Sequence, residues 1–175
     1  CRHRIGFEKV DVKPTRTKFR KPGMALTMNG IAQGYLTDKI VALLRHSGIR
    51  SALVQTGETY GLGNHAEGHA WRLGVPDPKE PGQLTRIISL EDRAVATSAP
   101  MGTIFDRAGR FHHLFDPHTG QCTRDWSSVT VKAPSAAIAD ALSTAFSAMP
   151  QKMILDTVQL LPEVGVHMVG SDGTI

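Results

Sequence analysis

The stretch SSVTVKAPSAAIADALSTAFSAM, residues 127–149, decides the fold, because it predicts a strand followed directly by a helix. The segment SSVTVKA is rich in β-branched residues, which is typical of a strand. Ser135 is a residue type that caps helices, and the helix that it predicts runs from Ala136 to about Met149. The stretch therefore brings both kinds of secondary structure into one short part of the chain.

The same helix carries a row of polar side chains. Asp140, Ser143, Thr144 and Ser147 recur at i, i+3, i+4 and i+7, which puts them on one face of an otherwise apolar helix. One interpretation is a solvent-facing stripe, although such stripes usually carry Lys and Glu rather than small hydroxyls. The other is a cation site, because a carboxylate and a hydroxyl one turn apart supply the oxygen ligands that Mg²⁺ prefers. The pattern by itself leaves both interpretations open.

The rest of the chain predicts short strands and two further helices. Apolar residues at helical spacing indicate a helix from Ile31 to about His46, which Ser47-Gly48 ends, and another from about Lys152 to Leu161. Strand character recurs in residues 6–13, 23–28, 51–57, 71–78, 85–90, 93–98, 110–115 and 165–170. Strands and helices do not alternate strictly, so we predict an α+β fold with a mixed, largely antiparallel sheet packed with helices.

Composition predicts a single domain, residues 1–175. The chain is 41% hydrophobic and 21% charged, close to the averages of soluble globular proteins. No apolar run reaches the roughly 18 residues that a transmembrane helix needs. Two cysteines do not make a disulfide framework. These features argue against a transmembrane helix within the 175 residues and against a disulfide-stapled scaffold.

The net charge of +4 is concentrated at the start of the chain, where basic residues outnumber acidic ones. Such a segment could meet a phosphorylated ligand or a nucleic acid. Aromatic residues, on which bases stack, are sparse there. We therefore interpret the segment as a solvated pair of strands and predict no nucleic-acid binding.

The stretch MALTMNGIAQGYLTDK, residues 24–39, predicts a glycine turn that opens a helix. Small residues at Gly30, Ala32 and Gly34 would let a phosphate approach the free N–H groups of the helix start. Gly30 also offers an accessible carbonyl to a hard cation. The alternative is a tight packing joint between a strand and a helix, and the segment alone favours this alternative.

The stretch FHHLFDPHTGQ, residues 111–121, is rich in histidine. A strand would send His112 and His113 to opposite faces, which argues against a shared zinc ion. Asp116 to Gly120 has the composition of a turn. One histidine that faces inward beside this turn is well placed for proton transfer. Three other histidines are interpreted as ordinary loop or strand residues rather than ligands: His65, His69 and His167.

Together these segments resemble the FAD:protein FMN transferase (ApbE-like flavin transferase) family. The matching motifs occur in the family's order: NGIAQGYLTDKIVALLRHSGI, ALVQTGETYGLG, AVATSAP, HHLFDPHTG and SVTVKAPSAAIADALSTAF. The resemblance extends from about Gly6 to the end of the chain. The Asn-Gly-Ile-Ala-Gln form is similar to a branch that serves nitrous-oxide respiration.

The resemblance implies a reaction and a set of site residues. The reaction is the Mg²⁺-dependent transfer of FMN from FAD to a threonine hydroxyl of an acceptor flavoprotein subunit, with release of AMP. The implied metal ligands are the Gly30 carbonyl, Asp140 and Thr144. His113 matches the catalytic histidine, which we expect to act as general base, and Asp116 would hold its loop. The implied cofactor-binding residues are Thr27, Gly30, Gln33, Gly57, Glu58, Ser98 and Phe115.

Some positions depart from the family pattern. Thr27 replaces an aspartate and Gln33 replaces a lysine, a pair of changes that leaves the local charge balance intact. Ser98-Ala99-Pro100 replaces Ser-Gly-Asp. Family members are generally longer, so we expect this chain to be the C-terminal part of a flavin transferase, with a nucleotide pocket open on one side. The resemblance also implies a periplasmic protein, with a preceding segment as the candidate membrane anchor.

Other functions remain open at this point. One is an FAD-binding or maturation module without turnover, which would have no need of a base beside a metal. Another is an FAD pyrophosphatase that uses water as the acceptor. Ester hydrolysis by Ser98, His113 and Asp116 has little support, because the Gly-x-Ser-x-Gly elbow is absent.

Overall fold

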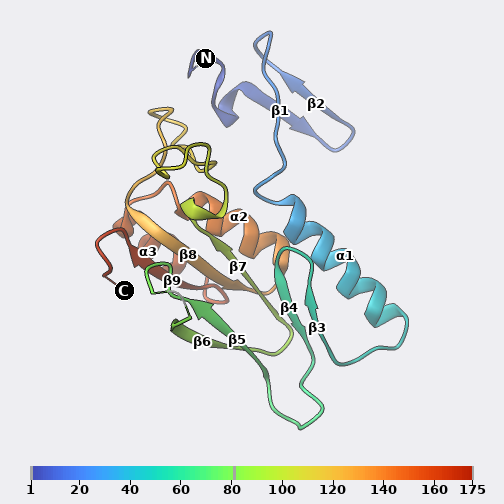
Figure 1. Cartoon of the computed structure of the whole chain (residues 1–175). Helices are drawn as coiled ribbons and strands as arrows, with labels where there is room; N and C mark the ends of the chain where they lie inside the picture. The colour runs from blue at the N-terminus through green and yellow to red at the C-terminus, as the bar shows by residue number, and fades with distance from the viewer. Residues whose placement is uncertain (1, 81, 175) are drawn as a thin grey trace.

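The computed structural model describes residues 2–80 and 82–174, and a five-stranded antiparallel sheet forms its centre (Figure 1). The strand order is β3-β4-β7-β8-β9, and every neighbouring pair is antiparallel. The strands span β3 Ala52–Gln55, β4 Thr59–Leu62, β7 Arg93–Ser98, β8 Trp126–Ala133 and β9 Gly165–Gly170. The predicted α+β class, with its largely antiparallel sheet, is confirmed.

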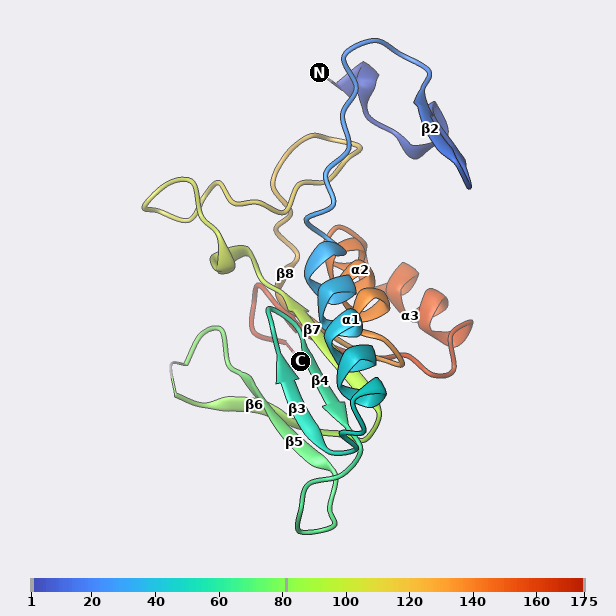
Figure 2. The same ribbon diagram turned by 90° about the vertical axis from the view of Figure 1, so that its right-hand side faces the viewer.

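Helices cover one face of this sheet and a hairpin lies on the other (Figure 2). The helices are α1 Ala32–His46, α2 Ala136–Phe146 and α3 Gln151–Gln159, and the hairpin consists of β5 Trp71–Pro76 and β6 Leu84–Leu90. All three helices were predicted to within a few residues. Among residues 2–80 and 82–174, no helix combines the length and the hydrophobicity that crossing a bilayer requires.

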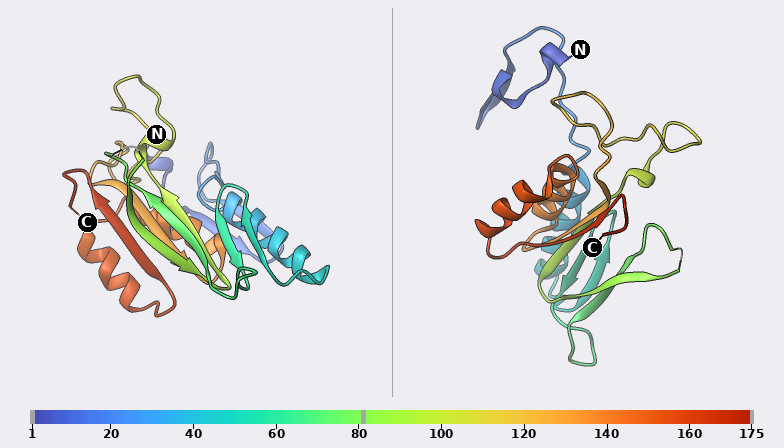
Figure 3. Two further views of the ribbon diagram at one scale, coloured as in Figure 1. Left: turned by 60° about the horizontal axis from the view of Figure 1, so that its bottom comes forward. Right: turned by 90° about the vertical axis from the view of Figure 1, so that its left-hand side faces the viewer.

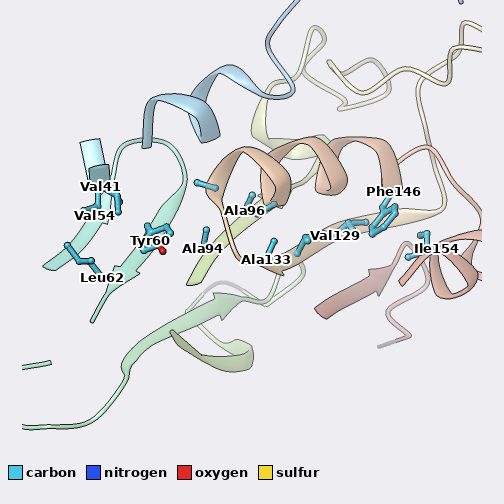
Figure 4. Close-up of a cluster of buried hydrophobic side chains, with 13 residues drawn as sticks. Val41, Val54, Tyr60, Leu62, Ala94, Ala96, Val129, Ala133, Phe146 and Ile154 are labelled. Atoms are coloured by element: carbon cyan, nitrogen blue, oxygen red, sulfur yellow. The ribbon is translucent and has the colours of Figure 1, made fainter. Parts of the chain in front are cut away.

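Strand β8 is buried on both faces because it lies between these two layers. Val129 and Val131 join the core under α2 and α3, where Phe146 and Ile154 are also fully buried (Figure 4). On the other face, the Lys132 ammonium donates to the Ser89 carbonyl of β6 at 2.7 Å. Burial on both faces explains why β-branched residues follow one another along this strand without alternating with polar ones.

A small hairpin near the start of the chain stands apart from the sheet and its helices (Figures 1 and 3). It consists of β1 Val10–Lys13 and β2 Arg16–Phe19, and most of its residues are exposed. The interpretation of the basic segment as a solvated strand pair is confirmed. The predicted strand 6–13 is only partly right, because Phe7–Lys9 forms a 3₁₀ turn.

Two predicted strands are wrong. Residues 24–28 are irregular, with Leu26 and Met28 exposed, because no strand of residues 2–80 and 82–174 pairs with them to complete a ladder. Residues 110–115 make isolated bridges at His112 and Phe115 but no continuous strand. The expected buried strand 51–57 ends at Gln55 and turns back into β4, and only Val54 of β3 is fully buried.

Candidate functional site

The starts of α1 and α2 are held together by reciprocal carboxylate contacts. Asp38 of α1 accepts hydrogen bonds from the backbone N–H groups of Ala136 and Ala137, at 2.7 and 3.0 Å. Asp140 of α2 accepts one through Oδ2 from the N–H of Gly34, at 3.0 Å. Each carboxylate thus satisfies N–H groups that a helix start leaves without an intrahelical partner.

Gly34 makes this close approach possible. A Cβ at Gly34 would lie 2.3 Å from the carbonyl oxygen of Ala136, which no real side chain tolerates. Two further N–H groups at this helix start, those of Ile31 and Ala32, donate to the Met28 carbonyl. The helix start is therefore a tight packing joint, and the interpretation as an open phosphate cradle at Gly30, Ala32 and Gly34 is not supported.

The polar stripe of α2 faces inward. Asp140, Ser143 and Ser147 are only 5%, 1% and 4% exposed. The Ser98 hydroxyl, at the end of β7, lies 2.9 Å from that of Ser143 and 3.4 Å from that of Thr144. The interpretation as a solvent-facing stripe is therefore wrong. Its small hydroxyls fit because the helix packs closely on the sheet.

The structure brings the three predicted cation ligands together from two separate segments. Asp140 and Thr144 lie one turn apart on α2. Gly30 lies against Thr144, because a Cβ on Gly30 would come within 3.0 Å of Thr144 Cγ2 and 3.2 Å of its Oγ1. A carboxylate, a hydroxyl and a backbone turn thus meet at the start of α1.

Glu58 adds a second buried carboxylate to this corner. It follows the end of β3 and is 9% exposed. Burial, together with the negative charge of Asp140, raises the pKa of Glu58 to about 7, although a hydrogen bond from the Thr97 backbone lowers it in part. Burial also raises the pKa of Asp140, and the Gly34 hydrogen bond offsets part of this rise.

These carboxylates have no basic partner. Within residues 2–80 and 82–174, neither Glu58 nor Asp140 forms an ion pair. Two neighbouring buried carboxylates favour a bound cation, which would compensate both charges. The donors are all oxygen atoms, so the residues present fit Mg²⁺ better than a softer metal.

The turn between β3 and β4 is fixed by contacts with α1. Gly57 has φ +107°, a conformation that favours glycine, and the Gln33 side chain lies where a Cβ would be, at 2.9 Å. The Thr56 hydroxyl lies 2.8 Å from that of Thr37. A pocket of about 230 Å³ opens beside Glu58 and extends to the β5 strand. The start of α1 and this turn therefore bring together Gln33, Gly57 and Glu58.

The two adjacent histidines have different environments. His112 is 4% exposed, its Nε2 lies 2.9 Å from the Thr123 carbonyl, and its Nδ1 accepts the N–H of Leu114. His113 is exposed, with Nδ1 3.1 Å from the Thr103 carbonyl. The opposite orientation of the two side chains is confirmed. The inward-facing histidine is His112, and the predicted catalytic His113 lies at the surface.

The contact of His113 with Thr103 nevertheless leaves it chemically competent. A carbonyl only accepts hydrogen bonds, so Nδ1 carries the proton and Nε2 keeps the lone pair that a general base needs. Thr103 follows Ser98 by a short 3₁₀ turn, Pro100–Gly102. His113 therefore contacts the segment that follows Ser98, the residue whose hydroxyl lies beside that of Thr144.

Three predicted residues make contacts within their own loops. The Asp116 carboxylate accepts from the His118 N–H and the Thr119 hydroxyl, both at 2.8 Å, and these bonds lower its pKa. Phe115 is exposed and stacks on Phe105, with ring centroids 6.2 Å apart. The Thr27 hydroxyl accepts from the Asn29 N–H. Among the described residues, none of the three has a hydrogen bond to Glu58, Asp140 or Thr144.

Sequence reasoning missed Asp38, which positions the site although it does not line it. The available signal was a carboxylate one turn beyond Gly34 on the predicted helix. Its partners, Ala136 and Ala137, are distant in sequence, so only the packing of α1 on α2 identifies them.

The arrangement of these motifs has counterparts in known proteins. The sequence model of the ApbE family matches residues 1–168. The chain belongs to the ApbE family. Among curated relatives, the FAD:protein FMN transferase of Treponema pallidum is 38% identical over 144 residues, which are 75% of this chain and 40% of that protein. That of Rhodobacter capsulatus is 31% identical, over 95% of this chain and 32% of its own length.

Solved ApbE structures share the fold. The crystal structure of the ApbE protein of Thermotoga maritima has a TM-score of 0.89 at 29% identity, covering 99% of this chain and 58% of that one. The flavinyl transferase ApbE of Pseudomonas stutzeri, in its apo form, has a TM-score of 0.79 at 28% identity, covering 97% and 53%. The chain therefore spans between about a third and three fifths of the length of these relatives. The assignment to a nitrous-oxide branch and the residue range 1–175 as a single C-terminal domain stay predictions.

Proposed function

We propose that this chain takes part in the transfer of FMN from FAD to a threonine hydroxyl of an acceptor protein, with Mg²⁺ bound and AMP released. The curated relatives are named FAD:protein FMN transferases. The observation that carries the proposal is the convergence of Gly30, Thr144, Asp140 and Glu58, because it puts an oxygen-rich, negatively charged corner where a metal–diphosphate substrate would bind.

Asp140, Thr144 and the Gly30 carbonyl would hold the cation, with Glu58 as a nearby second carboxylate. When bound, Mg²⁺ neutralises the diphosphate of FAD and polarises the phosphorus that is attacked. Asp140 is held for this task by Gly34, which occupies Oδ2 and leaves Oδ1 without a hydrogen-bond partner among residues 2–80 and 82–174. The Ser98 hydroxyl orients that of Thr144 through their 3.4 Å contact.

His113 is the general base in this proposal. Its Nε2 takes the proton of the acceptor threonine as Oγ forms a bond to the phosphorus of the FMN half. The bond between that phosphorus and the bridging oxygen breaks, and AMP leaves with the bridging oxygen. The exposure of His113 suits this role, because an acceptor protein has to reach it from outside.

The same exposure favours a second candidate, hydrolysis of FAD to FMN and AMP. Water reaches a surface histidine as readily as a threonine hydroxyl does, so the acceptor decides between transfer and hydrolysis. A product assay separates them, since transfer leaves FMN on a protein and hydrolysis leaves it free.

The test combines FAD, Mg²⁺ and a threonine-bearing acceptor protein with the chain, and mass spectrometry follows the acceptor. We expect a covalent FMN adduct and AMP with the wild-type chain. Asp140→Asn and Thr144→Val should lose both products. The matched surface controls Asp156→Asn and Thr157→Val, both on α3, should retain them. Absence of free and bound FMN with an intact wild-type chain would instead support a binding module without turnover.

We also propose a periplasmic location, with membrane attachment through a segment outside residues 1–175. Its support is the family resemblance. Fractionation of cells that express the natural protein, followed by detection with an antibody, tests it, and recovery from the cytoplasmic fraction would contradict it.

A further inference from the structure

The loop between β4 and β5 holds three metal-ligating side chains that face one another. They are His65, Glu67 and His69, and one ligand atom from each lies within 4.8 Å of the other two. Glu67 Oε2 is 3.0 Å from His69 Nε2 and 3.8 Å from His65 Nδ1. The two imidazole rings are stacked, with centroids 4.7 Å apart and planes 3° from parallel. All three residues come from five consecutive positions of one loop.

The hydrogen bonds of both histidines turn one ring nitrogen of each toward Glu67. His69 Nε2 donates to the Glu67 carboxylate, so a bound metal ion would replace the proton on that nitrogen. His69 Nδ1 lies 2.9 Å from the Ala70 carbonyl, which only accepts, so Nδ1 carries a proton and Nε2 is the nitrogen that faces Glu67. The backbone N–H of Glu67 donates to His65 Nδ1 at 3.3 Å, which makes Nδ1 the unprotonated nitrogen of His65. A backbone carbonyl that fixes the tautomer of a histidine is the usual outer contact of a metal ligand.

The loop is ordered by its own contacts. The His65 N–H donates to the His69 carbonyl, and the Gly68 N–H donates to the His65 carbonyl, both at 2.8 Å. The His65 ring also packs edge-on against Trp71, with centroids 5.0 Å apart. These contacts hold the three side chains of the ligand set close to one another.

We propose that His65, Glu67 and His69 bind one divalent transition-metal cation of the Zn²⁺ class. Two imidazoles and a carboxylate are ligands that Zn²⁺, Ni²⁺ and Cu²⁺ prefer, whereas Mg²⁺ prefers sites made of oxygen alone. Three protein ligands leave coordination positions open to solvent, because Glu67 and His69 are exposed. For His65 and His69, this proposal replaces the interpretation as ordinary loop residues.

This site is separate from the proposed flavin chemistry. The loop follows the end of β4, whereas Glu58 precedes its start, so the two sites lie at opposite ends of that strand (Figure 1). The donor sets also differ, since the corner around Asp140 offers only oxygen atoms. Failure of one proposal therefore leaves the other standing.

Trp71 supplies a direct readout. The chain has two tryptophans, so a Trp126→Phe variant leaves Trp71 as the only one. Cu²⁺ or Ni²⁺ bound beside His65 should quench its fluorescence in a saturable, one-to-one titration, and Zn²⁺ should compete. Millimolar Mg²⁺ should not compete for the site. Calorimetry of the unsubstituted chain with Zn²⁺ gives the same stoichiometry without any change at Trp126.

The decisive comparison is a double variant, His65→Ala with His69→Ala. We expect it to weaken Zn²⁺ binding by at least about 100-fold, because even outer-shell changes cost 10- to 100-fold in metal affinity. A matched double variant, His46→Ala with His118→Ala, should bind like the wild type. Circular dichroism monitors folding in both. Equal Zn²⁺ affinity in the two double variants, or quenching that does not saturate, would overturn the proposal.

Discussion

Glu58 and Asp140 are buried carboxylates from distant parts of the chain, and the charge of one acts on the protonation of the other. Burial raises the pKa of Asp140, and the hydrogen bond from the Gly34 N–H offsets part of this rise. Burial and the Asp140 charge then keep a proton on Glu58 up to about pH 7. Without a cation, this corner of the molecule therefore carries one negative charge while Glu58 is protonated and two once Glu58 ionises.

The first prediction concerns stability and pH. The raised pKa of Glu58 means that the native state binds more protons than the unfolded state between about pH 4.5 and 7, so the free energy of unfolding falls as pH rises through this window. Glu58→Gln should remove this fall, which amounts to about 3 kcal/mol for a difference of about 2.5 pKa units at roughly 1.4 kcal/mol per unit. Urea unfolding at several pH values measures it. An identical pH slope in wild type and Glu58→Gln would contradict the coupling.

The second prediction concerns cation binding and pH. Mg²⁺ competes with the Glu58 proton, so the rise in melting temperature on adding Mg²⁺ should be larger at about pH 8 than at about pH 5. In Asp140→Asn this rise should vanish at both pH values. Thermal unfolding with and without a chelator provides the measurement. A rise in melting temperature that is independent of pH would contradict competition between Mg²⁺ and the Glu58 proton.

A third prediction tests the joint between α1 and α2. Gly34→Ala should destabilise the fold by about 1–3 kcal/mol or more, as overpacking does, because the new methyl group would meet the Ala136 carbonyl. Gly165→Ala is the control, since a Cβ there meets nothing within 4 Å. Chemical denaturation compares the two. Equal stabilities would show that the helices can separate without cost.

The fourth prediction separates the neighbouring histidines. His112→Ala should lower the free energy of unfolding by about 1–3 kcal/mol, because it leaves the Thr123 carbonyl and the Leu114 N–H without their partner. His113→Ala should leave stability nearly unchanged but lower FMN transfer by about 100- to 10,000-fold, the usual contribution of a general base. Denaturation and initial rates measure the pair. The opposite pattern would move the catalytic role to His112.

Local patterns in the sequence were enough for the helices and for most of the sheet. The β-branched run before Ser135 predicted β8, and Ser135 itself marked the start of α2. The spacing of Asp140 and Thr144 then predicted two metal ligands on one face of that helix. The burial of that face was left open, because the sequence does not say which side of a helix meets the sheet. Asp38 and the Glu58–Asp140 coupling depend on tertiary packing between distant segments.

The strand predictions for the irregular segments were wrong for a similar reason. Residues 24–28 have strand composition, but a strand needs a partner, and within the part of the chain that the structure describes no strand pairs with them. His113 was identified by its resemblance to a family motif, whereas its exposed position follows from a loop whose course the sequence pattern did not predict. Motif order therefore predicted the candidate site, and packing determines its geometry.

The central claim is that the α2 face around Asp140 and the turn around Gly30 bind the cation on which flavin transfer depends. The most direct test is the binding of Mn²⁺, as a spectroscopic substitute for Mg²⁺, measured beside FMN transfer in the same samples. All samples carry His65→Ala and His69→Ala, so that the second proposed metal site does not contribute. We predict that Asp140→Asn loses both the Mn²⁺ and the transfer, and that Asp156→Asn loses neither. Undiminished Mn²⁺ binding and transfer in Asp140→Asn would contradict the account.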